Sequence, residues 1–313
     1  MNPVVRSSIA AAVVAALFAG GYFLFRSPEP APVPVSETPP APIDDAWCAS
    51  AFAPIGGGGC FAAPSRPAER VPLLVYLHGR YSPAMIEEET VRQNRVAKLA
   101  TAKGYAVLSM HGTQGECTQP ELADMWCWPS NPRNVDHGPA FFERIKPVMA
   151  AARARVGASG PNVLLGFSNG AYFAALIATR SLGPFDAIAI AHGGPVQPTR
   201  PVGTTPPVLL ITADDDPSDG EMRELDAELT QESWAHELVS REGVHALLDW
   251  DVDIALTFFD RVQKERLPLT PPLQPFRPRV VKEASAGAGE EEGGEGEDED
   301  EDGGEDEDDD GGS

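Results

Sequence analysis

The sequence predicts an α/β fold in which a mostly parallel central sheet carries helices on both faces. Short apolar runs alternate with longer mixed segments between residues 71 and 262, and most of the runs are nearly continuous. Such alternation is typical of parallel strands joined by crossover helices, and continuous apolar runs are typical of strands covered on both sides. This part of the chain is long enough to bury one sizeable core.

Six apolar segments are expected to be strands of that sheet: Leu73–Leu77, Tyr105–Met110, Asn162–Gly166, Ala187–Ala191, Val208–Thr212 and Trp234–Ser240. The mixed segments between and after them are expected to be helices: Glu87–Lys103, Gly138–Val156, Ala171–Ser181, Gly220–Thr230 and Ala255–Lys264. Together they predict one folded domain over residues 47–267.

The N-terminal part of the chain differs from this domain. Residues 1–26 contain an apolar run from Ile9 to Phe25, which fits an uncleaved signal anchor or a cleaved signal peptide. We favour the anchor, because cleavage after the small residues near Gly20 would leave an unusually apolar new terminus. Residues 27–46 form a stiff, Pro-rich linker. Either alternative predicts an extracytoplasmic domain, anchored to a membrane only through this segment or secreted.

The C-terminal part, residues 268–313, is expected to be a Pro-containing and then acidic tail without order of its own. Of the 47 carboxylates in the chain, 17 follow Lys282, and no Lys or Arg does, so residues 1–282 carry only −6 of the net charge of −23. The acidity of the tail argues against nucleic acid as a partner. It does not bear on the fold, and the role of the tail stays open.

Four cysteines agree with an oxidising compartment. Three pairings are possible, and we favour the two local ones, Cys48 with Cys60 and Cys117 with Cys127. No CxxC or His-x-x-Cys spacing occurs, so we expect no metal site.

Ser168 is the candidate nucleophile. It lies in the sequence Gly-Phe-Ser-Asn-Gly, between Gly166 and Gly170, after one apolar segment (163–165) and before another (171–176). A sharp strand-to-helix turn exposes such a serine and directs backbone N–H groups at the reacting carbonyl. The flanking glycines are needed because side chains there would collide with the neighbouring strand and helix. Taken alone, the short pattern also fits a serine that caps a helix.

A second feature is the apolar strand that ends in His78-Gly79-Arg80. Its carboxyl end lies where an oxyanion donor is needed, so we assign the two donors to the backbone N–H groups of Arg80 and Asn169. We expect His78 to support this loop by hydrogen bonding and not to act as the base.

The acid that orients the base is expected after the strand at Val208–Thr212, where three aspartates are consecutive. Asp216 is our choice, because Pro217 favours a turn directly after it, and Asp214 is the alternative. At least one of the three must belong to a solvated acidic turn.

His245 is the candidate general base among six histidines. It follows the last predicted strand after a short loop, whereas His236 falls inside that strand and would not reach the sheet edge. The chain order Ser168, Asp216, His245 is the order of one hydrolase architecture and differs from those of chymotrypsin and subtilisin.

With these residues in place, the chain resembles the α/β-hydrolase superfamily over about residues 60–265. Leu77-His78-Gly79, the Gly-Phe-Ser-Asn-Gly stretch around Ser168 and Cys127-Trp128 are similar to the secreted polyhydroxyalkanoate depolymerase, feruloyl esterase and acetyl xylan esterase group. The resemblance implies an α/β-hydrolase fold and ester hydrolysis by a Ser-His-Asp triad without a cofactor. Arg80 after His-Gly and the Asp-rich acid loop depart from the group and leave the substrate subclass open.

Only residues 193–207 join the strand at Ala187–Ala191 to the next one, so we expect no sizeable cap domain and an open site suited to a bulky or polymeric ester. The longest insertion, 112–137, contains Trp126 and Trp128. These either stack on a substrate or pack under a disulfide-tied loop, and we favour packing. A peptidase or amidase on the same fold and a non-catalytic, membrane-tethered binding protein are the alternatives. The oligomeric state is open.

Overall fold

The computed structural model describes residues 47–64, 69–131, 133–157, 160–194 and 206–265. Ten strands are present in these ranges: β1 (Ala53–Gly56), β2 (Gly59–Ala62), β3 (Leu73–Leu77), β4 (Ala106–Met110), β5 (Thr113–Gln114), β6 (Trp126–Cys127), β7 (Asn162–Phe167), β8 (Ala187–Ala191), β9 (Val208–Ala213) and β10 (His236–Arg241). The α-helices of the same ranges are α2 (Ile86–Ala102), α3 (Gly138–Val156), α4 (Asn169–Thr179), α5 (Asp219–Gln231) and α6 (Asp249–Glu265).

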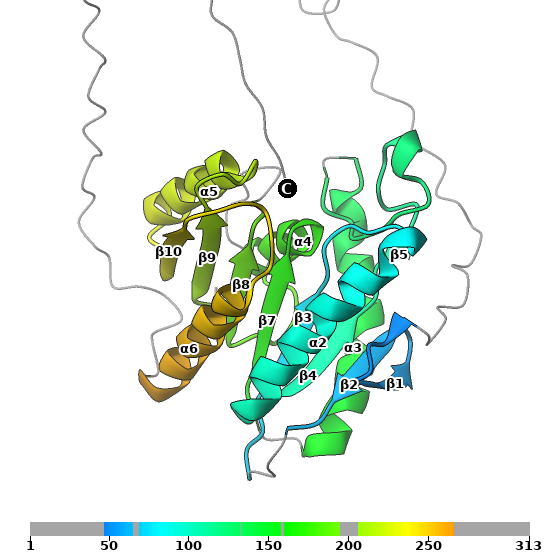
Figure 1. The fold of residues 1–313 in the computed structure, drawn as a ribbon. Helices are drawn as coiled ribbons and strands as arrows, with labels where there is room; N and C mark the ends of the chain where they lie inside the picture. Colours follow the sequence, from blue (N-terminus) through cyan, green and yellow to red (C-terminus); the bar gives the residue numbers. More distant parts are fainter. Residues whose placement is uncertain (1–46, 65–68, 132, 158–159, 195–205, 266–313) are drawn as a thin grey trace, which may run out of the picture. The chain divides into compact units, whose positions relative to one another are not determined.

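Eight of the strands form one sheet in the order β1-β2-β4-β3-β7-β8-β9-β10. Six neighbouring strands of this sheet are parallel: β4, β3, β7, β8, β9 and β10. Strands β1 and β2 form an antiparallel hairpin, and β2 pairs antiparallel with β4 at the edge. Helices α2 and α6 cover the face toward the viewer in Figure 1, and α3, α4 and α5 cover the other. The predicted mostly parallel sheet between two helical layers is therefore confirmed.

Alternation along the buried strands divides the core between these two faces. In β3, Leu73, Val75 and Leu77 pack toward α3 and α4, whereas Leu74 and Tyr76 pack toward α2 and α6. All five side chains are fully buried. Burying one such apolar side chain contributes about 1.5–3 kcal/mol, so the apolar side chains of the buried strands hold the sheet between its helical layers.

Several predicted boundaries differ from the structure, and one hairpin was not predicted. The last strand begins at His236 and not at Trp234, whose indole N–H donates to the carbonyl of Pro206 outside the sheet. The last helix begins at Asp249, six residues before the predicted Ala255, because its polar first turn hides the apolar pattern. The hairpin of β1 and β2 was not predicted, since β1 is short and largely exposed.

The described residues do not test our expectations for the two ends of the chain. The apolar run 9–25, the Pro-rich linker and the acidic tail lie outside those residues, as does the connection 195–205 on which the absence of a cap depends. Within the described ranges, none of the helices combines the length and apolarity that a membrane span requires.

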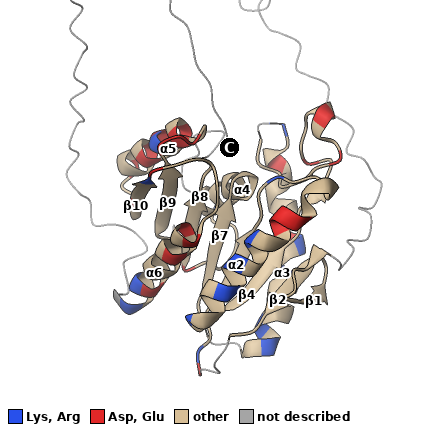
Figure 2. Ribbon diagram, viewed as in Figure 1, with Lys and Arg blue, Asp and Glu red and all other residues tan. Residues whose placement is uncertain are grey.

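Several helices have acidic side chains in the first turn or basic side chains in the last turn (Figure 2). The first turns of α2, α5 and α6 are acidic, and basic side chains lie in the last turns of α3 and α6. Each such charge stabilises its helix by about 0.3–1 kcal/mol through the helix dipole. The parallel arrangement therefore makes the edge formed by the carboxyl ends of the strands the more acidic one.

Glu89 on α2 is an exception to the usual exposure of charged side chains. It is fully buried, its Oε2 accepts a hydrogen bond from Nε of Arg92 at 2.9 Å, and its Oε1 has no hydrogen-bond partner among the described residues. Burial raises the pKa of Glu89 to about 7, against the opposing charge of Arg92. The folded protein therefore retains a proton that the unfolded chain releases between about pH 4.5 and pH 7.

This shift predicts a pH-dependent stability. The free energy of unfolding is expected to fall by on the order of 3 kcal/mol as pH rises from 4.5 to 7, since each pKa unit corresponds to about 1.36 kcal/mol. Urea unfolding at pH 5 and pH 8 measures the change, and Glu89→Gln should largely remove it. Glu88→Gln, at an exposed neighbouring position, should retain it. Equal pH dependence in wild type and Glu89→Gln would contradict the assignment.

Candidate active site

Ser168 is the single residue between the end of β7 and the start of α4, where the chain turns sharply. Its backbone has φ 52° and ψ −121°, a conformation that non-glycine residues adopt at a cost of roughly 1–3 kcal/mol. The N–H of Ser168 donates to the carbonyl of Ala191 at the end of β8, at 2.9 Å, which holds the turn. The strand-turn-helix setting predicted for Ser168 is thus present.

The two glycines that flank this turn are required by close packing. A Cβ at Gly166 would lie 2.4 Å from the carbonyl oxygen of Gly170, and a Cβ at Gly170 would lie 2.3 Å from that of Leu77. Both distances are shorter than any real contact of this kind, and both neighbours are backbone atoms that cannot give way. The collision predicted from the sequence is therefore confirmed.

His245 lies on the connection between β10 and α6 and reaches Ser168 across the sheet edge. Its Nε2 is 2.8 Å from Oγ of Ser168, and its Nδ1 is 3.0 Å from Oδ1 of Asp216. Because a carboxylate only accepts, Nδ1 carries the proton and donates to Asp216. That tautomer leaves the lone pair of Nε2 to accept the hydroxyl proton of Ser168.

Of the three consecutive aspartates, Asp216 is the one that meets His245. Asp214 and Asp215 are exposed, and Asp214 accepts a hydrogen bond from the hydroxyl of Ser240 instead. Asp216 is 5% exposed, and its Oδ1 accepts from the backbone N–H and the hydroxyl of Ser218. Burial alone would raise the pKa of Asp216, but the hydrogen bonds from Ser218, His245 and His192 lower it to about 2. Asp216 is therefore a carboxylate at neutral pH.

The two residues assigned as oxyanion donors lie on either side of Ser168. Asn169 is the first residue of α4, where a helix leaves its N–H groups without carbonyl partners. Arg80 follows Gly79, and a Cβ at Gly79 would be only 3.2 Å from Cβ of Ser168, so this loop passes directly beside the serine. The donor roles of Arg80 and Asn169 remain predictions.

His78 holds this loop by hydrogen bonds to the backbone. It is fully buried, its Nε2 accepts from the N–H of Gly112 at 2.8 Å, and its Nδ1 therefore carries the proton that it donates to the carbonyl of Gly79 at 2.6 Å. Burial lowers the pKa of His78 well below its usual range, which keeps it neutral. In a trans peptide the N–H of Arg80 points away from the Gly79 carbonyl. His78 thus orients that N–H without touching Ser168.

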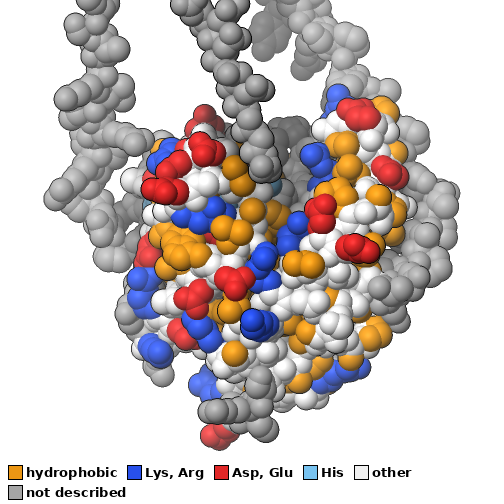
Figure 3. Space-filling model, viewed as in Figure 1, with side chains coloured by type: hydrophobic (Ala, Val, Ile, Leu, Met, Phe, Trp, Pro, Cys, Tyr) orange, Lys and Arg blue, Asp and Glu red, His pale blue; other side chains and the backbone are white. Residues whose placement is uncertain are grey.

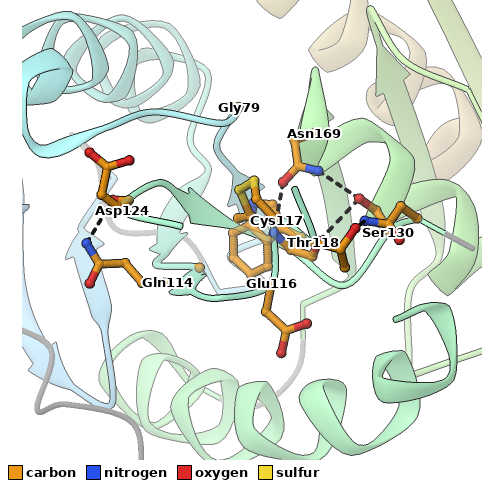
Figure 4. Close-up of a disulfide and its surroundings, with 12 residues drawn as sticks. Gly79, Gln114, Glu116, Cys117, Thr118, Asp124, Ser130 and Asn169 are labelled. Atoms are coloured by element: carbon orange, nitrogen blue, oxygen red, sulfur yellow. Dashed lines mark hydrogen bonds between the residues drawn. A yellow bond between two sulfur atoms is a disulfide. The ribbon is translucent and has the colours of Figure 1, made fainter. Parts of the chain in front are cut away.

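The loop around the disulfide of Cys117 and Cys127 contacts the first residue of α4 (Figure 4). Cys48 pairs with Cys60 and Cys117 pairs with Cys127, as favoured from the sequence. The side chain of Asn169 accepts from the N–H of Trp128 at 2.8 Å and donates to the hydroxyl of Ser130 at 2.7 Å. The start of α4 is therefore tied to the loop that the second disulfide closes.

The tryptophans of this loop pack and do not project. Trp128 is fully buried, stacks on Phe173 at a centroid distance of 5.6 Å and donates its indole N–H to the carbonyl of His78. Trp126 is half-buried and lies edge-on to His111, with the centroids 4.2 Å apart. The idea that Trp128 stacks on a substrate is wrong, because its ring belongs to the core.

Sequence reasoning missed three residues behind the acid. His192, which directly follows β8, has its Nδ1 2.5 Å from Oδ2 of Asp216. Asp251 in the first turn of α6 and Arg241 at the end of β10 complete a buried cluster around the ring of His192. One signal was available for His192, namely its position at the carboxyl end of a predicted strand. Asp251 carried no such signal.

The ligand atoms of His192, Asp216 and His245 all lie within 4.8 Å of one another, a spacing that suits a metal ion. A metal, however, requires an unprotonated nitrogen, and the Nδ1 atoms that face Asp216 are the atoms that donate their protons to it. Dialysis against EDTA is therefore expected to leave any catalytic activity of this site within about twofold of the untreated rate. A loss of activity that Zn²⁺ restores would contradict this expectation.

The arrangement of the sheet and its helices is that of an α/β-hydrolase fold. No family model matches the chain, and neither does any curated protein. Among solved structures, a carboxylesterase from Bacillus cereus is similar, with a TM-score of 0.50 and 17% identity over 65% of this chain and 93% of the other. A protein of unknown function from Agrobacterium tumefaciens has a TM-score of 0.46 at 20% identity, covering 64% of this chain and 94% of its own. Esterase PE8 has a TM-score of 0.46 at 22% identity, covering 64% and 99%.

Proposed function

We propose that the protein is an exported serine hydrolase that cleaves carboxylic esters through Ser168, His245 and Asp216. The observation that carries the proposal is the continuous chain of hydrogen bonds from Oγ of Ser168 through the ring of His245 to Asp216. A serine hydroxyl is a weak nucleophile at neutral pH, and an oriented imidazole is what activates it. The strained turn that presents Ser168 supports the same role.

In the first step His245 takes the hydroxyl proton of Ser168 through Nε2 as Oγ attacks the ester carbonyl. Asp216 holds the imidazole in the required tautomer and stabilises the imidazolium that forms. The backbone N–H groups of Arg80 and Asn169 stabilise the negative oxygen of the tetrahedral intermediate. His245 then gives its proton to the departing alcohol, which leaves Ser168 acylated.

In the second step water replaces the alcohol. His245 removes a proton from the water molecule as its oxygen attacks the acyl carbon, and the same oxyanion donors stabilise the second intermediate. Collapse of that intermediate breaks the bond to Ser168, whose oxygen takes the proton back from His245. The products are a carboxylic acid and the free enzyme, and no cofactor takes part.

Surface composition near His245 favours a neutral ester with an apolar part. The large hydrophobic side chains that are exposed among the described residues are Val91, Val244, Leu248 and Trp250. Three of them lie within five residues of His245 along the chain, and orange side chains gather in this part of the surface in Figure 3. The acidic first turns at the same sheet edge disfavour anionic substrates.

The substrate class we propose is therefore an apolar or polymeric ester of the kind cleaved by polyhydroxyalkanoate depolymerases, feruloyl esterases and acetyl xylan esterases. Export is supported by the apolar run at residues 9–25 and by the two disulfides, which persist in oxidising compartments.

A panel of substrates tests this function. The full-length protein should hydrolyse p-nitrophenyl butyrate and at least one hydroxyalkanoate, feruloyl or acetyl-sugar ester, with the corresponding amides slower by at least about 100-fold. Faster turnover of amides would favour a peptidase or amidase on this fold. The absence of turnover across the panel would favour a binding protein.

A further inference from the structure

A second histidine lies behind the acid of the site. His192 is fully buried and directly follows β8, with its backbone at φ 60°. Residues other than glycine rarely adopt such a conformation, and a buried residue keeps it only where the surrounding structure holds it. The N–H of His192 donates to the carbonyl of Ile211 on β9 at 2.8 Å, which fixes this turn between the two strands.

The ring of His192 is held at both nitrogens. Its Nδ1 is 2.5 Å from Oδ2 of Asp216, and its Nε2 lies 3.5 Å from Oδ2 of Asp251 and 3.3 Å from Nη2 of Arg241. Because Asp216 is a carboxylate, Nδ1 is the donor of the short bond. His192 therefore donates a hydrogen bond to Oδ2 of Asp216, and Ser218 donates to Oδ1.

Three hydrogen bonds in this arrangement set the plane of the Asp216 carboxylate. Ser218 donates two of them to Oδ1 and His192 donates one to Oδ2, and His245 faces both oxygens, at 3.0 and 3.1 Å. A carboxylate held only by Ser218 would be free to rotate about its side-chain bonds. The His192 bond removes this freedom, so that the acid presents a fixed edge to His245.

Charge balance gives His192 a second effect. The side chains of Asp216 and Asp251 are completely shielded from solvent, and Arg241, which pairs with Asp251 through two nitrogens, is the cation that faces them from β10. Two carboxylates and one guanidinium leave one uncompensated negative charge in this buried cluster, a costly state away from water. The hydrogen bond that His192 donates to Oδ2 stabilises the Asp216 carboxylate in these surroundings.

The turn at His192 also touches the nucleophile. The carbonyl of Ala191 accepts the N–H of Ser168, and a Cβ at Gly193 would lie 2.7 Å from the carbonyl oxygen of Ser168. The end of β8 thus contacts Ser168 through its backbone and Asp216 through the His192 side chain.

We propose that His192 is a positioning residue of this active site, which locks the Asp216 carboxylate in the orientation that His245 requires. The inference rests on the proposed function of Ser168, Asp216 and His245.

Two substitutions test the proposal. His192→Phe keeps a ring without a donor, whereas His192→Asn places an amide N–H where Nδ1 was and tolerates the positive φ. We expect His192→Phe to lower kcat by roughly 10–100-fold with little change in KM. His192→Asn should keep kcat within about fivefold of wild type. A kcat for His192→Phe within about threefold of wild type would overturn the proposal. So would an equal loss in both variants.

A spectroscopic measurement on the wild-type protein does not depend on the folding of these variants or on activity. Nitrogen-15 NMR of labelled histidine should find Nδ1 of His192 protonated, with its proton at unusually low field. An unprotonated Nδ1 would overturn the proposal. An inactive Ser168→Ala beside a fully active His192→Phe would refute only this inference, and full activity of Ser168→Ala would refute the proposed function while leaving the His192–Asp216 bond to be measured.

Discussion

Ser168→Ala is expected to lower kcat for p-nitrophenyl butyrate by roughly 10⁴–10⁶-fold, because it removes the only atom of the site that bonds to the acyl group. The remaining rate should come from the oxyanion donors and from binding alone, with water as the nucleophile. The substitution removes only the hydroxyl and keeps the Cβ that the strained turn already accommodates, so folding should be retained, which far-ultraviolet circular dichroism can check. Steady-state kinetics against a no-enzyme blank measure the loss.

The matched control for this variant is Ser240→Ala. Ser240 lies on β10 and its hydroxyl donates to the exposed Asp214, away from the bonds that link Ser168 to His245. Its removal should leave kcat within about twofold of wild type, as for most surface changes. Activity of Ser168→Ala above one part in about a hundred would mean that another group carries the reaction.

Asp216→Asn is expected to lower kcat by roughly 10³–10⁴-fold. The amide cannot stabilise the imidazolium of His245, and its NH₂ group directed at Nδ1 would select the tautomer with the proton on Nε2, which cannot accept from Ser168. Since the pKa of Asp216 is about 2, the acid stays ionised through the assay range, so the loss in Asp216→Asn should persist at every assay pH.

Asp214→Asn is the control that separates the two candidate acids. Asp214 is exposed and bonds to Ser240, so this variant should keep kcat within about twofold. A large loss in Asp214→Asn together with a small one in Asp216→Asn would reverse the assignment of the acid.

The central sheet was predictable because its strands are buried on both faces. Leu73–Leu77 and Ala187–Ala191 agree with the structure residue for residue, since continuous apolar runs leave few alternative boundaries. The edge hairpin of β1 and β2 could not be found in this way, because an edge strand such as Ala53–Gly56 is short and faces water.

The position of Ser168 was predictable for a different reason. A nucleophile at a strand-to-helix turn needs glycines at fixed offsets, so Gly166 and Gly170 leave a local pattern in the sequence. The acid and base followed from their order and their places after strands. Whether Asp214 or Asp216 faces the base depends on side-chain direction within one turn, and the Pro217 argument gave only a preference.

The residues around His192 mark the limit of such reasoning. His192, Arg241 and Asp251 come from the ends of β8 and β10 and the start of α6, and only the fold brings them together. No spacing rule links them, and Asp251 lies in a helical turn that periodicity did not detect. Packing of Trp128 was favoured from the sequence, but its partner Phe173 was not predicted, because their contact crosses from an irregular loop to α4.

The most direct test of the central claim is labelling of the full-length wild-type protein with a fluorophosphonate probe, followed by peptide mass spectrometry. Such a probe phosphonylates a serine only where a base and an oxyanion site activate it. We predict one equivalent of label on Ser168, abolished in Ser168→Ala and strongly slowed in Asp216→Asn. Failure of the probe to react, or its attachment to a different residue, would contradict the assignment of Ser168 as the nucleophile.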